Sequence, residues 1–123
     1  MASSLAGRAV MIVEDEFYLA DDLAVALSGL GAKVVGPFGR VEDARRRIEA
    51  GESVEFAVLD IDLAGNRVFP LAEMLREIGA PFVFVTGYDL EIIPERFSDA
   101  PRIEKPVAAA EVIRLLETLR QAR

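Results

Sequence analysis

Several residues that can carry phosphoryl or metal chemistry follow directly after short apolar runs. Asp60 comes after the run at positions 56–59, and Glu14 and Asp15 come after the run at positions 9–13. Thr86 and Lys105 end two further runs of this kind. A carboxylate can accept a phosphoryl group as an acyl phosphate when cations neutralise the transferring oxygens. These residue types therefore favour a metal-assisted phosphoryl acceptor with Asp60 as the nucleophile.

The three carboxylates also indicate a metal site. If the first and third strands are neighbours, Glu14, Asp15 and Asp60 converge, and like charges at such distances repel by roughly 1–4 kcal/mol per pair. The chain has no cysteine and no histidine, so a metal must be held by oxygen atoms, which points to Mg²⁺, Ca²⁺ or Mn²⁺. We expect Mg²⁺ for phosphoryl chemistry, with Mn²⁺ able to substitute for it. For the first pair alone, an alternative stays open: Asp15 or Glu16 could instead cap the helix that follows.

Three other residues at strand ends suit contacts to a phosphoryl group. Lys105 offers a compact positive charge on a long stem. Thr86 offers a hydroxyl donor, and Gly87 leaves room beside it. Each also has a simpler explanation, since a surface lysine before Pro106 or a branched residue in a strand is common. Their shared position at strand ends favours the functional interpretation.

Apolar runs and helical patterns alternate along the chain. Short branched runs are typical of strands buried on both faces, and apolar residues spaced three and four apart are typical of one-sided helices. The expected strands are Ala9–Glu14, Lys33–Val35 (closed by a turn at Gly36 and Pro37), Phe56–Asp60, Pro81–Thr86 and Arg102–Glu104. The expected helices run from Phe17 to Gly31, Val41 to Gly51, Leu71 to Gly79 and Val112 to Leu119, with a short or irregular one over Leu90–Phe97 because Pro94 interrupts it.

This alternation predicts an α/β fold, an open, doubly wound sheet of five parallel strands with helices on both faces. In such sheets ligands bind beyond the carboxyl ends of the strands, at the switch point in strand order. All the residues singled out above fall at those ends. The fold thus places the proposed chemistry in one crevice.

Composition excludes several other functions. A net charge of −7 disfavours direct DNA binding, which needs a basic face. No apolar stretch approaches the roughly 20 residues needed to span a bilayer, and the start lacks the pattern of a signal peptide. We therefore expect a cytoplasmic protein with no membrane contact.

With these residues placed, the chain resembles the receiver domain of bacterial two-component response regulators over about residues 8–121. The matching motifs are Ile12-Val13-Glu14-Asp15, Val58 to Leu63 around Asp60, Phe84-Val85-Thr86-Gly87 and Lys105-Pro106. Each motif is weak by itself, but all four occur together in the family's order and at its spacing. The stretch from Phe84 to Tyr88 is similar to a stand-alone subgroup found with alphaproteobacterial sensor kinases.

The resemblance implies a flavodoxin-like fold with strand order 2-1-3-4-5 and a receiver domain over residues 8–123, after a disordered N-terminal tail at 1–7. It implies that Asp60 takes a phosphoryl group from a histidine kinase or a histidine phosphotransfer protein. Mg²⁺ would bind at Asp15 and Asp60, with Glu14 acting through water and the backbone carbonyl of Asp62 completing the site. The Lys105–Pro106 peptide bond is expected to be cis, as in the family.

The chain also departs from the family pattern. Receivers commonly carry Tyr or Phe three residues before the site lysine, and this position is Arg102. Tyr88 is the candidate substitute in the switch. Asp62 and Tyr88 lie two residues beyond Asp60 and Thr86, so we expect them to tune the lifetime of the phosphorylated state.

For output, the resemblance implies contacts with a downstream protein that the sequence does not name, or service as a phosphorelay intermediate or phosphate sink. The expected partner face comprises Leu90–Phe97, the fifth strand and the last helix. Phe97 and Tyr88 would suit contacts there if exposed, although core packing is the commoner fate of a phenylalanine such as Phe97. We expect no output domain because four residues follow Leu119. Alternatives are a receiver detached from a hybrid kinase, a phosphorylation-silent binding module, and a phosphatase using Asp60 and Asp62 as an Asp-x-Asp pair. The phosphatase is disfavoured because Ala64 stands where Thr or Val is wanted, so the chain is expected to act as a signalling module rather than an enzyme.

Overall fold

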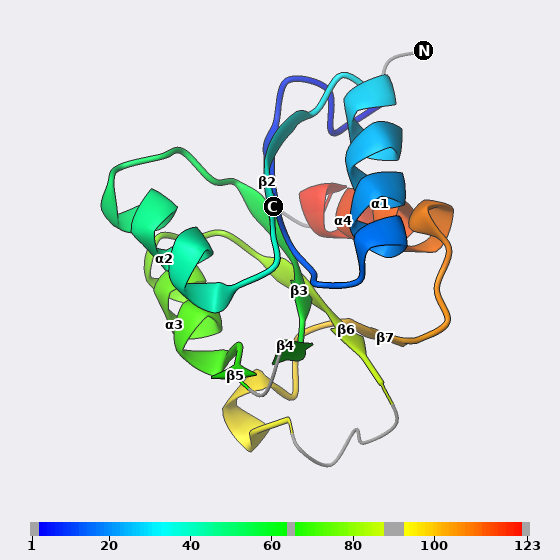
Figure 1. Cartoon of the computed structure of the whole chain (residues 1–123). Helices are drawn as coiled ribbons and strands as arrows, with labels where there is room; N and C mark the ends of the chain where they lie inside the picture. The colour runs from blue at the N-terminus through cyan, green and yellow to red at the C-terminus, as the bar shows by residue number, and fades with distance from the viewer. Residues whose placement is uncertain (1–2, 64–65, 88–92, 122–123) are drawn as a thin grey trace.

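Five short apolar segments form one parallel sheet in the computed structural model, which describes residues 3–63, 66–87 and 93–121 (Figure 1). The spatial order of the strands is β2-β1-β3-β6-β7, and every neighbouring pair in this sheet is parallel. The predicted fold class and strand order are therefore confirmed. The strands are β1 (Ala9–Val13), β2 (Lys33–Phe38), β3 (Phe56–Asp60), β6 (Phe82–Thr86) and β7 (Arg102–Glu104).

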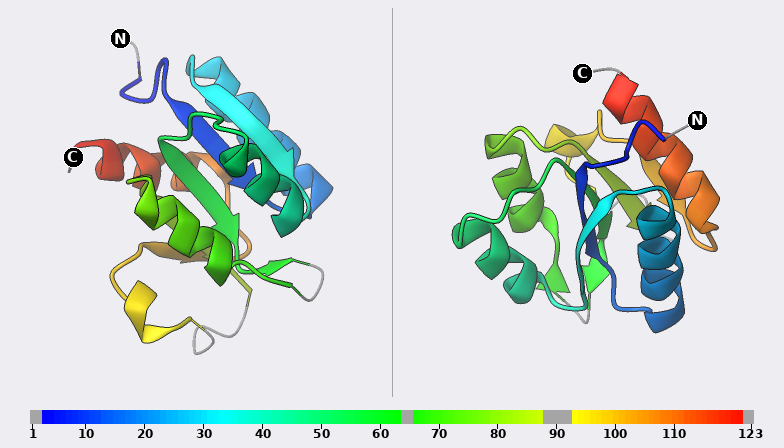
Figure 2. Two further views of the ribbon diagram at one scale, coloured as in Figure 1. Left: turned by 90° about the vertical axis from the view of Figure 1, so that its left-hand side faces the viewer. Right: turned by 90° about the horizontal axis from the view of Figure 1, so that it is seen from above.

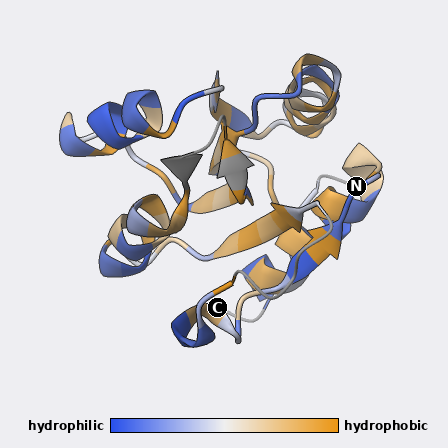
Figure 3. Ribbon diagram, turned by 60° about the horizontal axis from the view of Figure 1, so that its bottom comes forward, coloured by the Kyte–Doolittle hydropathy of each residue, from blue (hydrophilic) through white to orange (hydrophobic). Residues whose placement is uncertain are grey.

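In the part of the chain that the structure describes, four α-helices cover the two faces of this sheet. Seen from above in Figure 2, α1 (Phe17–Gly29) and α4 (Ala109–Gln121) lie on one side of the strands, and α2 (Val41–Glu49) and α3 (Phe69–Glu77) lie on the other. Each helix turns its apolar stripe toward the strands, as the hydropathy colouring in Figure 3 shows. No helix in the described ranges is long and apolar enough to cross a bilayer.

Because successive side chains of a strand point to opposite faces, the sheet divides the core into two clusters. Met11, Leu59 and Phe84 contribute to the cluster under α2 and α3. Val10 and Val58 contribute to the cluster under α1 and α4. Burial on both faces explains why the three central strands are continuous apolar runs rather than alternating ones. This rigid double-sided packing is what holds the carboxyl ends of β1, β3 and β6 in place.

The second strand is longer than expected and includes the two residues predicted to form a turn. Gly36 has φ of +105° and the Gly36–Pro37 peptide bond is cis. A Cβ atom at Gly36 would lie 2.9 Å from the carbonyl oxygen of Ile12, so only glycine fits there. The strand therefore passes through an irregular step, marked by a register shift opposite Met11 and Val13, instead of ending.

Two other segments differ from the sequence expectations, and a third agrees with them. A two-stranded antiparallel hairpin, β4 (Asp62–Leu63) with β5 (Asn66–Arg67), stands where a plain loop was expected. In the segment Leu90–Phe97, residues 90–92 lie outside the described part, and the rest contains a 3-10 turn at Glu95–Phe97, in keeping with the short or irregular helix expected there.

At the N-terminus, residues 3–7 differ from the disordered tail that was expected. Leu5 is completely buried against α1 and α4 residues, and the hydroxyl of Ser3 donates to a carboxylate oxygen of Glu117 at 2.9 Å. The amide of Gly7 donates to the carbonyl of Gly31 at 2.9 Å. Burial of the Leu5 side chain stabilises by about 1.5–3 kcal/mol, and together with these hydrogen bonds it offsets the entropy lost when the stretch is ordered.

Candidate functional site

The strand register brings the expected site residues to one edge of the sheet. Val13 pairs with Leu59, and Asp60 pairs with Val85, so Glu14, Asp60 and Thr86 all follow or end neighbouring strands. Because parallel strands end at the same edge, their last side chains meet there. Asp60 and Thr86 are the end residues of β3 and β6, and both are buried.

Three carboxylates converge at this edge. Glu14, Asp15 and Asp60 each place a carboxylate oxygen within 4.8 Å of the others. Glu14 and Asp60 are 2% and 3% exposed, while Asp15 is exposed. Within the described ranges, Oε1 of Glu14 is a buried atom with no hydrogen-bond partner. A buried carboxylate oxygen in that state is costly, and oxygen ligands of this kind suit a hard divalent cation.

The cluster therefore fits the metal that the sequence analysis expected. Glu14, Asp15 and Asp60 would hold it, and the open side at Asp15 would leave room for water and phosphate oxygens, which Mg²⁺ usually keeps. For Asp62, whose carbonyl was expected to complete the site, the structure describes the start of β4 and its pairing with Arg67.

Lys105 projects into this acidic cluster from the loop after β7. Its ammonium nitrogen lies 3.1 Å from Oε2 of Glu14 and 3.2 Å from Oδ2 of Asp60, and it also contacts Oε2 of Glu16. Its backbone amide donates to the carbonyl of Thr86 at 2.8 Å, which ties the loop to the end of β6. The lysine is thus held by both its main chain and its side chain beside the expected nucleophile.

The carboxylates also determine the charge of Lys105. Burial acts to lower the pKa of its ammonium group, but the hydrogen bond to Glu16 and the charges of Asp60 and Glu14 outweigh burial and raise the pKa above its ordinary value. Lys105 is therefore positively charged throughout the physiological range. A fixed positive charge next to Asp60 is what a transferring phosphoryl group needs.

Thr86 and Gly87 lie where the sequence analysis placed them. Thr86 is 1% exposed and its hydroxyl is 3.4 Å from the carbonyl oxygen of Gly87, a long contact that leaves the hydroxyl able to turn to another acceptor. Gly87 is exposed, and a Cβ there would meet no atom of the described residues within 4 Å. No side chain in the described ranges therefore crowds Gly87.

The structure also adds a residue that the sequence analysis had considered only as a helix cap. Glu16 is the N-cap of α1, but its side chain makes no capping hydrogen bond and contacts Lys105 instead. Its position directly after Glu14 and Asp15 was the available signal. A helix cap and a strand-end acid follow the same pattern in sequence, so only the fold separates the two roles.

The expectations for the Lys105–Pro106 peptide bond, Tyr88 and Arg102 have different outcomes. The Lys105–Pro106 peptide bond is cis, as the resemblance implied. Tyr88 lies outside the described residues. Arg102 stands at the expected position in β7, and its guanidinium donates to the carbonyls of Phe97 and Ser98, both at 3.3 Å. Arg102 thus fastens the 3-10 turn to the edge of the sheet.

The structure decides how Phe97 is placed. Its side chain is completely buried, stacked on Phe69 at 5.7 Å between ring centroids and in edge contact with Phe82 and Phe84. Of the two alternatives for Phe97, an exposed contact residue or a core residue, the structure shows the second. The ring packs between Phe69 of α3 and the β6 residues Phe82 and Phe84.

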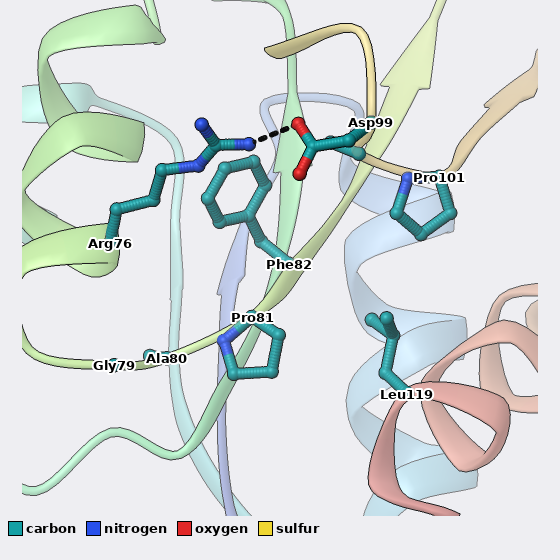
Figure 4. Close-up of a pocket in the computed structure, with 9 residues that line it drawn as sticks. Arg76, Gly79, Ala80, Pro81, Phe82, Asp99, Pro101 and Leu119 are labelled. Carbon is teal, nitrogen blue, oxygen red and sulfur yellow. Dashed lines mark hydrogen bonds and ion pairs between the residues drawn. The ribbon is translucent and has the colours of Figure 1, made fainter. Parts of the chain in front are cut away.

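Two hollows in the surface border the site, and a third lies away from it. One of about 540 Å³ is bordered by Glu16, Gly87 and Lys105, and one of about 360 Å³ by Glu14 and Asp15. A third, of about 270 Å³, lies at the opposite, amino end of β6 and is drawn in Figure 4. Because its lining residues come from that far end, it does not serve the carboxylate cluster.

Comparisons with known proteins agree with this geometry. The solution structure of SdrG from Sphingomonas melonis Fr1 is 35% identical, with a TM-score of 0.76, over 95% of this chain and 98% of that chain. A structure of the BeF3-activated conformation of SdrG is 34% identical, with a TM-score of 0.74, over 98% of this chain and 99% of that one. A response regulator receiver protein from Sinorhizobium medicae WSM419 shares the fold at 22% identity and a TM-score of 0.80, over 94% of this chain and 96% of that one.

Among curated proteins, the phyllosphere-induced regulator PhyR of Methylorubrum extorquens is 29% identical over 111 residues, which are 84% of this chain. The chain spans about 40% of the length of PhyR. No family model matches the chain. The shared fold, the near-complete coverage of SdrG and the site at the strand ends together show that the chain belongs to the response-regulator receiver family.

Proposed function

We propose that this receiver domain accepts a phosphoryl group on Asp60 in a Mg²⁺-dependent reaction. The observation that supports this most directly is the surrounding of Asp60: a buried carboxylate with Glu14 and Asp15 within 4.8 Å and the Lys105 ammonium 3.2 Å from one of its oxygens. The BeF3-activated form of the relative SdrG adds support, because beryllofluoride mimics a phosphoryl group.

The chain's own residues divide the chemistry between them. An oxygen of Asp60 attacks the phosphorus while the bond from phosphorus to the donor's nitrogen or oxygen breaks, and an acyl phosphate results. Lys105 neutralises the negative charge on the transferring phosphoryl oxygens, and the hydroxyl of Thr86 donates a hydrogen bond to one of them. A bound divalent cation would supply the remaining neutralisation of charge. Hydrolysis returns the domain to its unphosphorylated state: water attacks the phosphorus, inorganic phosphate is released, and Asp60 leaves as a carboxylate.

The proposed donor is a phosphohistidine of a sensor histidine kinase or of a histidine phosphotransfer protein. The phosphorylated domain then signals through contacts with another protein or passes the group on. Asp62 and Tyr88 are proposed to tune the lifetime of the phosphorylated state from their positions two residues beyond Asp60 and Thr86. The test is to measure the rate of phosphate release from the Asp62→Ala and Tyr88→Ala variants. Rates equal to that of the parent in both variants would refute this role.

The central test is incubation with acetyl phosphate and Mg²⁺ followed by intact-mass measurement. We expect the mass of the protein to rise by one phosphoryl group, and the adduct to be absent without the metal ion. Asp60→Asn should take up nothing. Asp22→Asn is the matched control, because it removes an exposed acid on α1 and should be labelled like the parent. An unlabelled parent protein would refute the proposal.

A further inference from the structure

Glu16 reaches across the mouth of the site to Lys105. Its carboxylate lies against the ammonium group, while its own backbone amide donates to Oε2 of Glu14 at 3.0 Å. Among the described residues, the Glu16 side chain makes no capping hydrogen bond to α1. This contact is therefore the feature of Glu16 that needs a functional explanation.

The donor capacity of Lys105 is fully used in this arrangement. An ammonium group has three N–H donors and no acceptor. Glu14, Glu16 and Asp60 each accept one of these hydrogen bonds. A phosphoryl donor that approaches Asp60 brings new acceptor oxygens while all three carboxylates are still in place. Lys105 can donate a hydrogen bond to those oxygens only if one of the three carboxylates gives up its own.

The burial of the three carboxylates decides which one is released. The side chains of Glu14 and Asp60 are 1% and 5% exposed, so turning either away would leave a buried charge without its partner. The side chain of Glu16 is 59% exposed and keeps its hydration when it turns outward. Breaking an ion pair on the solvent side costs little, because water replaces the lost partner. Glu16 is thus the partner that leaves at the lowest cost.

We propose that Glu16 is a positioning residue that holds Lys105 in the unphosphorylated protein and competes with the phosphoryl group for it. The inference rests on the proposed phosphoacceptor function and deepens it. Glu16 acts as an anionic placeholder: it keeps the ammonium charge beside Asp60 before the reaction and delays its transfer to the phosphoryl oxygens. Its removal should speed phosphorylation from a small donor and strengthen the binding of a phosphoryl mimic.

The kinetic test uses Glu16→Gln, which keeps the shape and removes the charge. With acetyl phosphate and Mg²⁺, we expect its rate of labelling, and its affinity for beryllofluoride, to rise roughly 1.5- to fivefold, the range set by an exposed ion pair. Glu16→Ala should change in the same direction. Asp22→Asn is the matched control, since Asp22 borders the same hollow and its loss removes the same charge from α1. An equal gain in that control, or no gain in the Glu16 variants, would overturn the inference.

A second test observes the lysine directly. The chain has two lysines, Lys33 and Lys105, so protein labelled with ¹³C at the lysine Cε atoms gives one signal for each. We expect Glu16→Gln to move the Lys105 signal of the free protein and leave the Lys33 signal in place, and Asp22→Asn to move neither. An unmoved Lys105 signal would refute the contact. If the parent takes up no phosphoryl group, the proposed function fails, while these signals still decide whether Glu16 holds Lys105.

Discussion

Replacing Phe97 by alanine should cost a large part of the stability of this domain. The ring is completely buried and lies 5.7–6.0 Å, between centroids, from Phe69, Phe82 and Phe84. The guanidinium carbons of Arg76 and Arg96 each lie 4.8 Å from its centre. Phe97 is the buried anchor of the connection between β6 and β7, the strands that carry Thr86 and lead to Lys105.

The magnitude follows from these contacts. A buried Phe→Ala substitution costs about 3–5 kcal/mol, because lost transfer free energy and a new cavity add together. Each aromatic pair contributes roughly 0.5–1.5 kcal/mol beyond burial, which places Phe97 in the upper half of that range, near 4–5 kcal/mol. Domains are stable by about 5–15 kcal/mol, so the variant should fold but with little reserve.

Urea unfolding measures this difference. With a slope of roughly 1–3 kcal/mol per molar urea, the midpoint of the Phe97→Ala variant should fall by about 2 M. Phe17→Ala is the matched control, since Phe17 is 73% exposed and its loss should change stability by no more than about 0.5 kcal/mol. A loss below about 1.5 kcal/mol for Phe97→Ala, or equal losses in both variants, would refute the burial of this ring as the anchor of the segment.

Three further predictions concern the site, the turn and an ion pair. Glu14→Gln should weaken Mg²⁺ binding roughly tenfold or more, because the buried Oε1 of Glu14 loses its charge; the Mg²⁺ concentration needed to raise the thermal midpoint measures this, and an unchanged value would contradict it. Arg102→Ala should cost roughly 1 kcal/mol and speed hydrogen exchange at the amide of Ala100, which closes the same turn by donating to the carbonyl of Phe97; unaltered exchange there would show that the guanidinium does not fasten the turn. The hydrogen bond from Arg76, drawn in Figure 4, holds the pKa of Asp99 below its usual range. That stabilisation is present above the unfolded pKa near 4 and is lost as pH falls through the lowered value, so the difference in urea midpoint between the parent and Asp99→Asn should shrink from pH 6 to pH 3; a constant difference would exclude this pair as its source.

Much of the fold was accessible from the sequence because local pattern and global packing agree. The run at residues 56–59 is apolar at every position, which is typical of a strand buried on both faces, and the helical stripes between such runs need a sheet to cover. The irregular step at Gly36 was missed because glycine and proline together usually mark a turn. Its cause is a close approach to the carbonyl of Ile12, which comes from a different strand.

For the candidate site too, some features follow from the sequence and others only from the tertiary structure. The sequence by itself determined the set of groups, because acids, a threonine and a lysine at strand ends meet wherever parallel strands share an edge. It also determined that any metal must be held by oxygen atoms, since histidine and cysteine are absent. Only the tertiary structure decided that Glu16 contacts Lys105 rather than capping α1, and that Phe97 is buried rather than exposed. Both outcomes depend on contacts between segments far apart in the chain, and the energies of such contacts are set by burial and distance, which no local pattern contains.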